Sequence, residues 1–224
     1  MNSKKQVLFS WSGGKDSSLA LYEIQKSQDY DIVALITTIT ADYDRVSMHG
    51  LRTSLLEEQA EYLNIPLEKV FISKNASNDE YESKFNEALL RYKRAGISQV
   101  VFGDLFLEEI KKYREDLLQK VGMGCLFPIW KQDTTKLAYE FIDLGFKAIT
   151  VCVDSNVLGK EFAGREFNKE FLNNLPDGID PCGENGEFHT FVYEGPIFNK
   201  SINKKLGDIV LRDERFFYCD ILTV

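Results

Sequence analysis

The chain has 224 residues, a formal net charge of −8 and 44% hydrophobic residues. This length fits one large α/β domain or a domain with a smaller second lobe, and the apolar content suffices for a packed core, which excludes a disordered protein. The acidic balance argues against a protein that coats nucleic acid through a general positive field, so nucleic acid is not an expected partner.

The N-terminal segment, residues 1–5, leads directly into a strand and lacks the apolar region of a signal peptide. No apolar stretch is long enough to cross a membrane. The 4 cysteines are far apart in the sequence and form no C-x-x-C pair, which favours free thiols in a reducing compartment. We therefore expect a cytoplasmic protein without a membrane partner.

A glycine-rich turn, Ser12–Ser17 (SGGKDS), joins a strand predicted over Gln6–Ser10 to a helix predicted over Asp16–Lys26. The adjacent glycines, Gly13 and Gly14, allow a tight turn and a close backbone approach to a ligand. The free N–H groups of the first helical turn point at that ligand, and the helix dipole favours negative charge there. The arrangement predicts an anion site.

The polar residues of this turn suit a phosphate ligand. Lys15 adds a cation, Ser12 and Ser17 add hydroxyl donors, and Asp16 fits a divalent cation that bridges it to phosphate oxygens. The pattern differs from a Walker P-loop and resembles the pyrophosphate-binding loop of the N-type ATP pyrophosphatases, which cleave ATP between the α and β phosphates. A Gly-Gly turn with Ser and Asp helix capping is the alternative that the residues leave open.

Strands and helices alternate through the rest of the first half. The predicted strands are Asp31–Thr40, Lys69–Ile72, Gln99–Gly103 and Ala148–Val153, and the predicted helices are Leu51–Leu63, Asn78–Ala95 with Asn78 as its cap, Glu108–Val121 and Leu137–Leu144. This alternation predicts a doubly wound parallel sheet with helices on both faces, and ligands beyond the carboxyl ends of its strands.

The C-terminal part has a different pattern. We predict a helix over Lys160–Leu175, a turn-rich loop over 177–186, a β-prone run over Phe188–Tyr193, and two antiparallel strands, Asp208–Arg212 and Phe216–Val224. The expected organisation is a nucleotide-binding domain over residues 1–128 and a smaller α+β substrate-binding lobe over residues 129–224. The apolar C-terminal strands offer an edge for a homodimer.

Polar residues at strand ends and helix starts add candidates. Thr37 lies near the end of the second strand, where a nucleoside pocket is expected, although an ordinary strand residue is an equal alternative. His49 and Arg52 precede a helix and suit a phosphate or carboxylate, against ordinary structural roles. Gly103-Asp104 follows an apolar strand, so Asp104 suits a metal or an amine, against a helix cap. Arg114 on the next helix is interpreted as surface charge that could reach a ligand.

The second dense cluster is the segment 180–190 (DPCGENGEFHT). Glu184 and Glu187 lie close enough in sequence to present two carboxylates to an amine or a metal, and His189 follows them. A turn at Asn185-Gly186 is the structural alternative. Cys182 as a nucleophile is the weaker hypothesis, because no fixed partner is evident.

Through these two clusters, the chain resembles the ATP-binding family that contains diphthine–ammonia ligase. The resemblance rests on residues 10–17 (SWSGGKDS), 102–104 (FGD) and 183–190 (GENGEFHT), and residues 48–52 (MHGLR) are similar to short prokaryotic members. It implies an adenine-nucleotide-hydrolase-like fold, adenylation of a carboxylate with release of pyrophosphate, and attack by ammonia to give an amide. The implied cofactors are ATP and Mg²⁺, and the implied partners are a small-molecule or protein-borne carboxylate and ammonia.

The motifs and the resemblance together assign the candidate site. The residues assigned to catalysis are Lys15, Asp16 and Asp104, with Asp16 also holding Mg²⁺. Those assigned to the nucleotide are Ser10, Ser12, Gly13, Gly14, Lys15, Asp16, Ser17, Thr37 and Gly103. Those assigned to the acceptor are His49, Arg52, Glu184, Glu187 and His189. The alternatives are a related enzyme that acts on another metabolite or on tRNA, and a nucleotide-binding sensor without catalysis.

Overall fold

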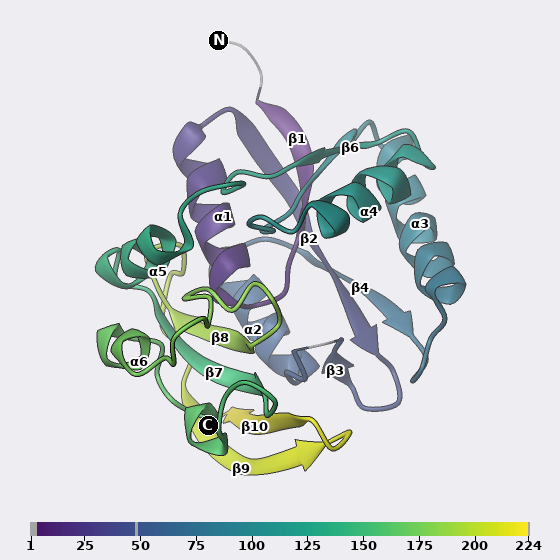
Figure 1. Ribbon diagram of the computed structural model, residues 1–224. Helices are drawn as coiled ribbons and strands as arrows, with labels where there is room; N and C mark the ends of the chain where they lie inside the picture. The colour runs from purple at the N-terminus through teal and green to yellow at the C-terminus, as the bar shows by residue number, and fades with distance from the viewer. Residues whose placement is uncertain (1–3, 48, 224) are drawn as a thin grey trace.

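The structure, a computed structural model, describes residues 4–47 and 49–223, which form two sheets with helices packed around them (Figure 1). The strands are β1 (Lys5–Ser10), β2 (Tyr30–Thr40), β3 (Arg45–Val46), β4 (Leu67–Ile72), β5 (Gln99–Val101), β6 (Gly124–Leu126), β7 (Lys147–Asp154), β8 (Phe188–Glu194), β9 (Lys204–Arg212) and β10 (Phe216–Thr223). The helices are α1 (Lys15–Ser27), α2 (Thr53–Leu63), α3 (Asn78–Arg94), α4 (Glu108–Gln119), α5 (Thr134–Asp143), the 3₁₀ turn η1 (Lys160–Phe162) and α6 (Lys169–Asn173).

The first sheet is parallel except at one corner. Its parallel strands run in the order β4-β2-β1-β5-β6, and the short β3 pairs antiparallel with the end of β2. The chain winds outward from β1 in both directions, so the gap between the ends of β1 and β5 is the point where the strand order reverses. Ligands bind at such points in doubly wound sheets. The predicted fold class, α/β with a parallel sheet, is therefore confirmed.

The central strand β1 is apolar because both of its faces are covered. Val7 and Phe9 pack with α1 and α2, whereas Leu8 between them packs with α3 and α4, and all three side chains are fully buried. The period of two in a strand sends successive side chains to opposite faces. This is why the sequence shows a continuous apolar run here rather than alternation.

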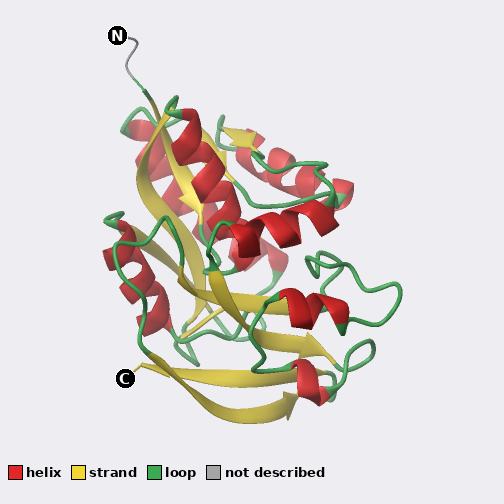
Figure 2. Ribbon diagram, turned by 90° about the vertical axis from the view of Figure 1, so that its left-hand side faces the viewer, coloured by secondary structure: helices red, strands yellow, loops and turns green. Residues whose placement is uncertain are grey.

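The second sheet is antiparallel, with strands in the order β8-β7-β10-β9. It lies at the opposite end of the molecule from the start of β1 (Figures 1 and 2). The edge strand β9 carries Leu206, Val210 and Leu211 exposed to solvent. A homodimer through this edge stays a prediction. No helix among residues 4–47 and 49–223 has the length and apolar character that a membrane span needs.

The helix predicted over Lys160–Leu175 is wrong. A 3₁₀ turn and the five-residue α6 stand there, and the chain between them runs beside β7. The amide of Thr150 donates to the Arg165 carbonyl (2.9 Å), and Gly164 adopts a φ of +79°, which a continuous helix does not allow. Pairing with a buried strand therefore satisfies backbone groups that a helix would have satisfied internally.

Smaller differences concern the ends of elements. The cap of α3 is Ser77 rather than Asn78, because the Ser77 hydroxyl accepts from the Glu80 amide (3.2 Å). The second helix begins at Thr53, two residues later than predicted. The strands β3 and β6 are two and three residues long and were not predicted. Val224, the last residue of the last predicted strand, lies outside the described residues.

Candidate active site

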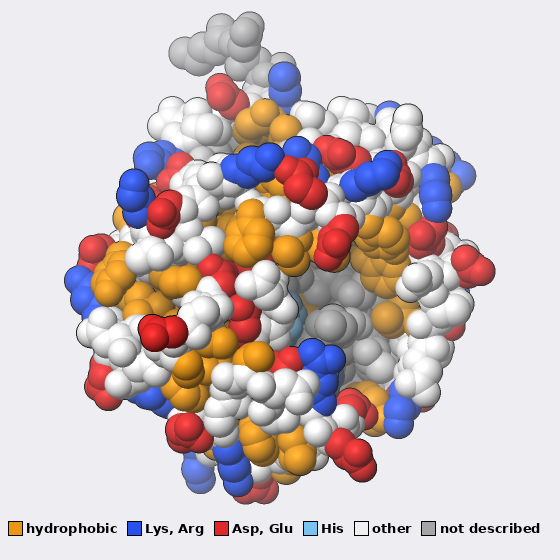
Figure 3. Space-filling view, viewed as in Figure 1, with side chains coloured by type: hydrophobic (Ala, Val, Ile, Leu, Met, Phe, Trp, Pro, Cys, Tyr) orange, Lys and Arg blue, Asp and Glu red, His pale blue; other side chains and the backbone are white. Residues whose placement is uncertain are grey.

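A cavity of about 210 Å³ lies at the carboxyl ends of β1 and β5. Residues from four separate parts of the chain line it: Ser10, Ser12, Gly14–Ser17, His49, Phe102–Asp104, Arg114, Gly183, Glu184 and Phe188–Thr190. Figure 3 shows that this face of the molecule is hollowed, with acidic and basic side chains around the hollow. The cavity therefore brings together the glycine-rich turn and the segment 180–190, the two clusters identified in the sequence.

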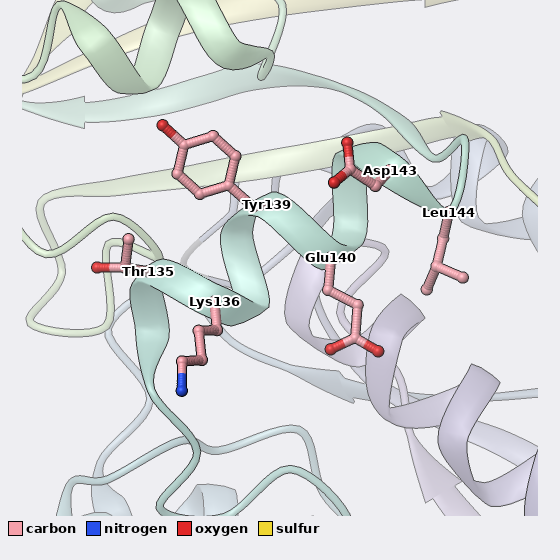
Figure 4. Close-up of a pocket in the computed structure, with 6 residues that line it drawn as sticks. All are labelled: Thr135, Lys136, Tyr139, Glu140, Asp143 and Leu144. Atoms are coloured by element: carbon pink, nitrogen blue, oxygen red, sulfur yellow. The ribbon is translucent and has the colours of Figure 1, made fainter.

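A second surface hollow, along α5, does not compete as a site. Its lining residues come from that helix and its end: Thr135, Lys136, Tyr139, Glu140, Asp143 and Leu144. Figure 4 shows Lys136, Glu140 and Leu144 on one side of the helix and Tyr139 and Asp143 on the other, so the polar groups do not meet at one point. A binding site needs polar groups that converge on a ligand, which this hollow lacks.

The turn after β1 opens the cavity to the start of α1. Gly13 has a φ of +78°, and α1 begins after Gly14 without a side-chain cap from that residue. The amide of Lys15 instead donates to the Thr190 hydroxyl (3.0 Å), which reaches it from β8. The antiparallel sheet thus supplies the first hydrogen bond at this helix start.

Gly103 allows β5 to approach that helix start. A Cβ at this position would lie 3.0 Å from the carbonyl carbon of Asp16 and 3.0 Å from the amide nitrogen of Ser17. Contacts this short with backbone atoms require something to shift. The glycine after β5 is therefore needed for close packing of the chain that follows this strand on the first turn of α1.

Lys15 is buried and fully engaged. Its Nζ donates to both Asp16 oxygens (2.9 and 2.8 Å) and to the Cys182 carbonyl, and it lies 5.4 Å from the centroid of the Phe188 ring. Burial opposes the ammonium form, but the Asp16 carboxylate outweighs it, so the pKa of Lys15 is raised. Lys15 stays charged and ties the glycine-rich turn to the loop before β8.

Asp104 is held by Arg114, which the sequence analysis interpreted as surface charge. The Arg114 Nε and Nη2 donate to the two Asp104 oxygens (2.7 and 3.0 Å). The guanidinium carbon lies 4.5 Å from the centroid of the Phe102 ring. Asp104 does not cap α4, whose N-cap residue is Leu107. The pattern of charges along this helix does not indicate that Arg114 lines the cavity.

Glu184 reaches the cavity from the loop before β8. Its Oε1 accepts from the amides of Leu105 (2.8 Å) and Phe106 (3.4 Å), so it fixes that loop against the end of β5. Burial raises the pKa of Glu184 to about 7, and the Asp16 and Asp104 carboxylates act in the same direction. This side chain can gain and lose a proton near neutral pH.

Two histidine rings lie next to each other at the cavity wall, tilted by 38°. The ring centroids of His49 and His189 are 4.5 Å apart. Burial lowers the pKa of His49 to about 4 and that of His189 well below its ordinary value. Both rings are therefore neutral at pH 7 and act there as hydrogen-bonding groups rather than as cations.

Four predicted site residues do not line the cavity. Gly13 faces α2, where a Cβ would meet Gln59, and Thr37 is buried within β2. Arg52 donates to Asp220 (3.1 and 2.5 Å) beside Arg45, at a separate cavity of about 680 Å³ between β3 and the β9–β10 hairpin.

Glu187, the fourth, turns inward. Its Oε1 accepts from the Asp180 amide (3.1 Å) and the Asn185 side chain (2.9 Å), so it shapes the loop. Met48, in the predicted segment 48–52, lies outside the described residues. Cys182 is buried and its thiol donates to the Thr134 carbonyl (3.3 Å). Burial raises its pKa, which disfavours a nucleophilic thiolate.

Comparison with known proteins places this cavity in a family context. The chain matches the diphthamide synthase N-terminal domain over residues 4–125 and the diphthamide synthase C-terminal domain over residues 133–221. A protein of Schizosaccharomyces pombe named diphthine–ammonia ligase is 26% identical over 216 residues, 88% of this chain but only 36% of that protein.

Vertebrate relatives with the same name are covered more fully. The Danio rerio protein is 26% identical over 232 residues, which cover 92% of this chain and 89% of the relative. The Mus musculus protein is 24% identical over 232 residues, with coverage of 92% and 85%. Since one family domain alone spans more than half of the 224 residues, the chain belongs to the diphthamide synthase family.

Proposed function

We propose that this protein is an ATP-dependent, AMP-forming carbon–nitrogen ligase. In this proposal a substrate carboxylate displaces pyrophosphate from the α-phosphorus of ATP, and ammonia then displaces AMP to form an amide. Membership of the diphthamide synthase family and relatives named diphthine–ammonia ligase support this reaction class. One observation carries it to this site: the glycine-rich turn, the Gly103-Asp104 pair and the loop around Glu184 converge on one cavity.

Each wall of the cavity has a physical role in this proposal. The start of α1, with the tight turn before it, holds the leaving pyrophosphate, because helix N-termini and their dipoles favour anions. The neutral His49 and His189 rings and Glu184 lie on the side of the acceptor. The relatives are named for diphthine. For this chain we propose a carboxylate on a small molecule or on a protein.

The charges of the cavity suit a divalent cation with the phosphates. Three carboxylates line it (Asp16, Asp104 and Glu184), against Lys15 and Arg114. The described part of the chain has no group of three or more His, Cys, Asp or Glu residues arranged to hold a metal alone. Mg²⁺ commonly binds through one or two carboxylates together with substrate phosphates, so the Asp16 carboxylate fits this ion. Bound there, Mg²⁺ would neutralise charge on the phosphates.

The test is a measurement of products. We expect ATP, Mg²⁺, ammonium and a panel of carboxylates to yield AMP and pyrophosphate in equal amounts, with release that depends on one carboxylate. We also expect ATP–pyrophosphate exchange without ammonium once that carboxylate is present. Asp16→Asn should reduce both activities at least tenfold. ATP that binds and stays intact throughout the panel would contradict the proposal and favour a nucleotide sensor.

A further inference from the structure

The two cations of the cavity differ in how many hydrogen-bond donors they have left. The Lys15 ammonium has three donors, and Asp16 and the Cys182 carbonyl accept from all of them. A phosphate could recruit Lys15 only by breaking these contacts. The Arg114 guanidinium has five donors, of which the Asp104 carboxylate takes two and the Tyr81 side chain a further one, so donors remain. Of the two cations that line the cavity, Arg114 is therefore the one with N–H donors free to bind a phosphate.

Two contacts, with the Phe102 ring and with the Asp104 carboxylate, fix the position of the Arg114 guanidinium. The centre of the guanidinium lies 4.5 Å from the centroid of the Phe102 ring, and its Nε and Nη2 pair with the two Asp104 oxygens; Phe102 and Asp104 flank Gly103. Gly103 in turn lies against the first turn of α1. This chain of contacts holds the guanidinium beside the helix start that favours an anion. A planar fork suits phosphate oxygens better than an ammonium does.

We propose that Arg114 binds the phosphates of the nucleotide and of the released pyrophosphate, and that Asp104 is a positioning residue that holds the guanidinium in place. This inference rests on the proposed function, since it assumes a polyphosphate in this cavity. It gives Asp104 a different role from the catalytic one expected from the sequence. It also assigns the phosphate contact to Arg114 rather than to Lys15.

The test measures binding of inorganic pyrophosphate with Mg²⁺ by calorimetry, and the KM for ATP in the exchange reaction. We expect Arg114→Gln to weaken pyrophosphate binding tenfold or more, the size of a lost charge-assisted hydrogen bond. Arg114→Lys should recover only part of this loss, because it restores the charge but not the fork. The matched control is Lys112→Gln, which removes an exposed cation from the same helix and should leave binding within twofold.

The role of Asp104 is tested by a double-mutant cycle. We expect Asp104→Asn to weaken pyrophosphate binding several-fold in the wild-type background and to change nothing further in the Arg114→Gln background. Independent, additive effects would overturn the positioning role. If Arg114→Gln fails to fold because Asp104 is left unpaired, the double variant removes both charges and carries the binding test.

The outcomes separate this inference from the proposed function. A wild-type protein that binds pyrophosphate, with Arg114→Gln within twofold of it, overturns the inference alone. A wild-type protein that neither binds pyrophosphate nor exchanges it with ATP overturns the proposed function and the inference with it. Pyrophosphate binding that Arg114→Gln abolishes, with Lys112→Gln unchanged, supports both.

Discussion

Glu184 is the residue whose protonation state most directly affects the proposed chemistry. Its pKa of about 7 arises from burial and from the neighbouring Asp16 and Asp104 carboxylates, while the Leu105 amide and the Lys15 cation oppose the rise. Formation of an amide from ammonium releases protons, and an ionised carboxylate beside the acceptor can take one. Glu184 is placed to do this above pH 7 and loses the ability below it.

We expect Glu184→Gln to remove a pH-dependent advantage of the wild type. The rate of AMP formation is measured for both proteins from pH 6 to 8.5 at fixed total ammonium. The ammonia–ammonium equilibrium affects both proteins equally, so the informative quantity is the ratio of wild-type to variant rates. This ratio should rise through about pH 7 and then level off. A ratio that is constant with pH would exclude a proton-accepting role. ATP–pyrophosphate exchange, which needs no ammonia, is the internal control.

His49 gives a stability prediction with a definite sign. Its folded-state pKa of about 4 lies below the ordinary value of 6.5, so between these values the unfolded chain binds a proton that the folded protein does not. Stability therefore falls as the pH falls through this window. Relative to His49→Gln, the wild type should lose about 1–2 kcal/mol of unfolding free energy between pH 7 and pH 5. Urea denaturation at both pH values measures this; equal losses in the two proteins would contradict it.

Much of the site could be predicted from local sequence, because the residues that follow parallel strands share one edge of a sheet. This explains why the Ser12–Ser17 turn and Asp104 meet. The partners of the charges could not be predicted. Arg52 pairs with Asp220, 168 positions away. In the sequence, Arg114 looks like the other charged residues of α4, and only the structure shows that its guanidinium lies over the Phe102 ring.

At the scale of elements, the site depends on how closely the end of β5 packs on the start of α1. Gly103 permits this approach, since any Cβ there would lie 3.0 Å from backbone atoms of Asp16 and Ser17. Neither element can yield cheaply, because a strand in the middle of the sheet and the first turn of a helix are both fixed by their hydrogen bonds. A one-atom change at Gly103 should therefore alter the position of the glycine-rich turn.

We expect Gly103→Ala to lower the free energy of unfolding by about 1–3 kcal/mol, the usual cost of overpacking. Pyrophosphate binding should weaken at least tenfold, because the helix start and Asp104 are pushed apart. Gly124→Ala is the matched control, because a Cβ there meets nothing within 4 Å. The unfolding free energy of this variant should stay within about 0.5 kcal/mol of wild type, as is usual for substitutions at the surface. Thermal denaturation and calorimetry measure the two effects. Equal behaviour of the two variants would contradict the packing argument.

The elements themselves were predictable to different degrees. In the first sheet, β1, β2, β4, β5 and the helices follow from buried apolar runs and amphipathic periodicity, whereas the short β3 and β6 do not. The predicted helix over Lys160–Leu175 is wrong because Phe162, Phe167 and Phe171 have nearly helical spacing, yet they pack on one another from a turn, a loop and a short helix. Pairing with β7 is a long-range contact that no local pattern reports.

At the scale of the whole molecule, the two sheets share one core. Buried side chains of β1, α1 and α2 pack in the same cluster as those of α5, β7 and β8. The glycine-rich turn itself is bonded to the second sheet, since the Val192 amide donates to the Gly13 carbonyl (2.9 Å). The division at residues 128 and 129 stays a prediction about sequence, and these contacts favour cooperative unfolding of both parts.

The side chain of Gln59 links the glycine-rich turn to the second sheet. It is fully buried in α2 and joins three segments: its Oε1 accepts from the Trp11 indole (2.8 Å), and its Nε2 donates to the carbonyls of Gly13 (3.0 Å) and Val192 (2.6 Å). An apolar replacement of similar size leaves the Trp11 indole N–H buried without its acceptor and removes one donor from the Val192 carbonyl and one from the Gly13 carbonyl, which keeps the Val192 amide. A buried group left without a partner costs about 1–3 kcal/mol, and such costs do not add fully.

We therefore expect Gln59→Leu to lower the unfolding free energy by at least about 2 kcal/mol in a single transition, because both sheets lose the same link. Gln25→Leu, an exposed replacement of the same kind in α1, should stay within roughly 0.5 kcal/mol of wild type. Pyrophosphate binding should also weaken in Gln59→Leu, since the Gly13 carbonyl loses one of its two donors and keeps only the Val192 amide. Chemical denaturation followed by tryptophan fluorescence and by far-ultraviolet circular dichroism measures the first effect. Two separated transitions, or a Gln59→Leu stability equal to that of Gln25→Leu, would show that the sheets are not coupled through this side chain.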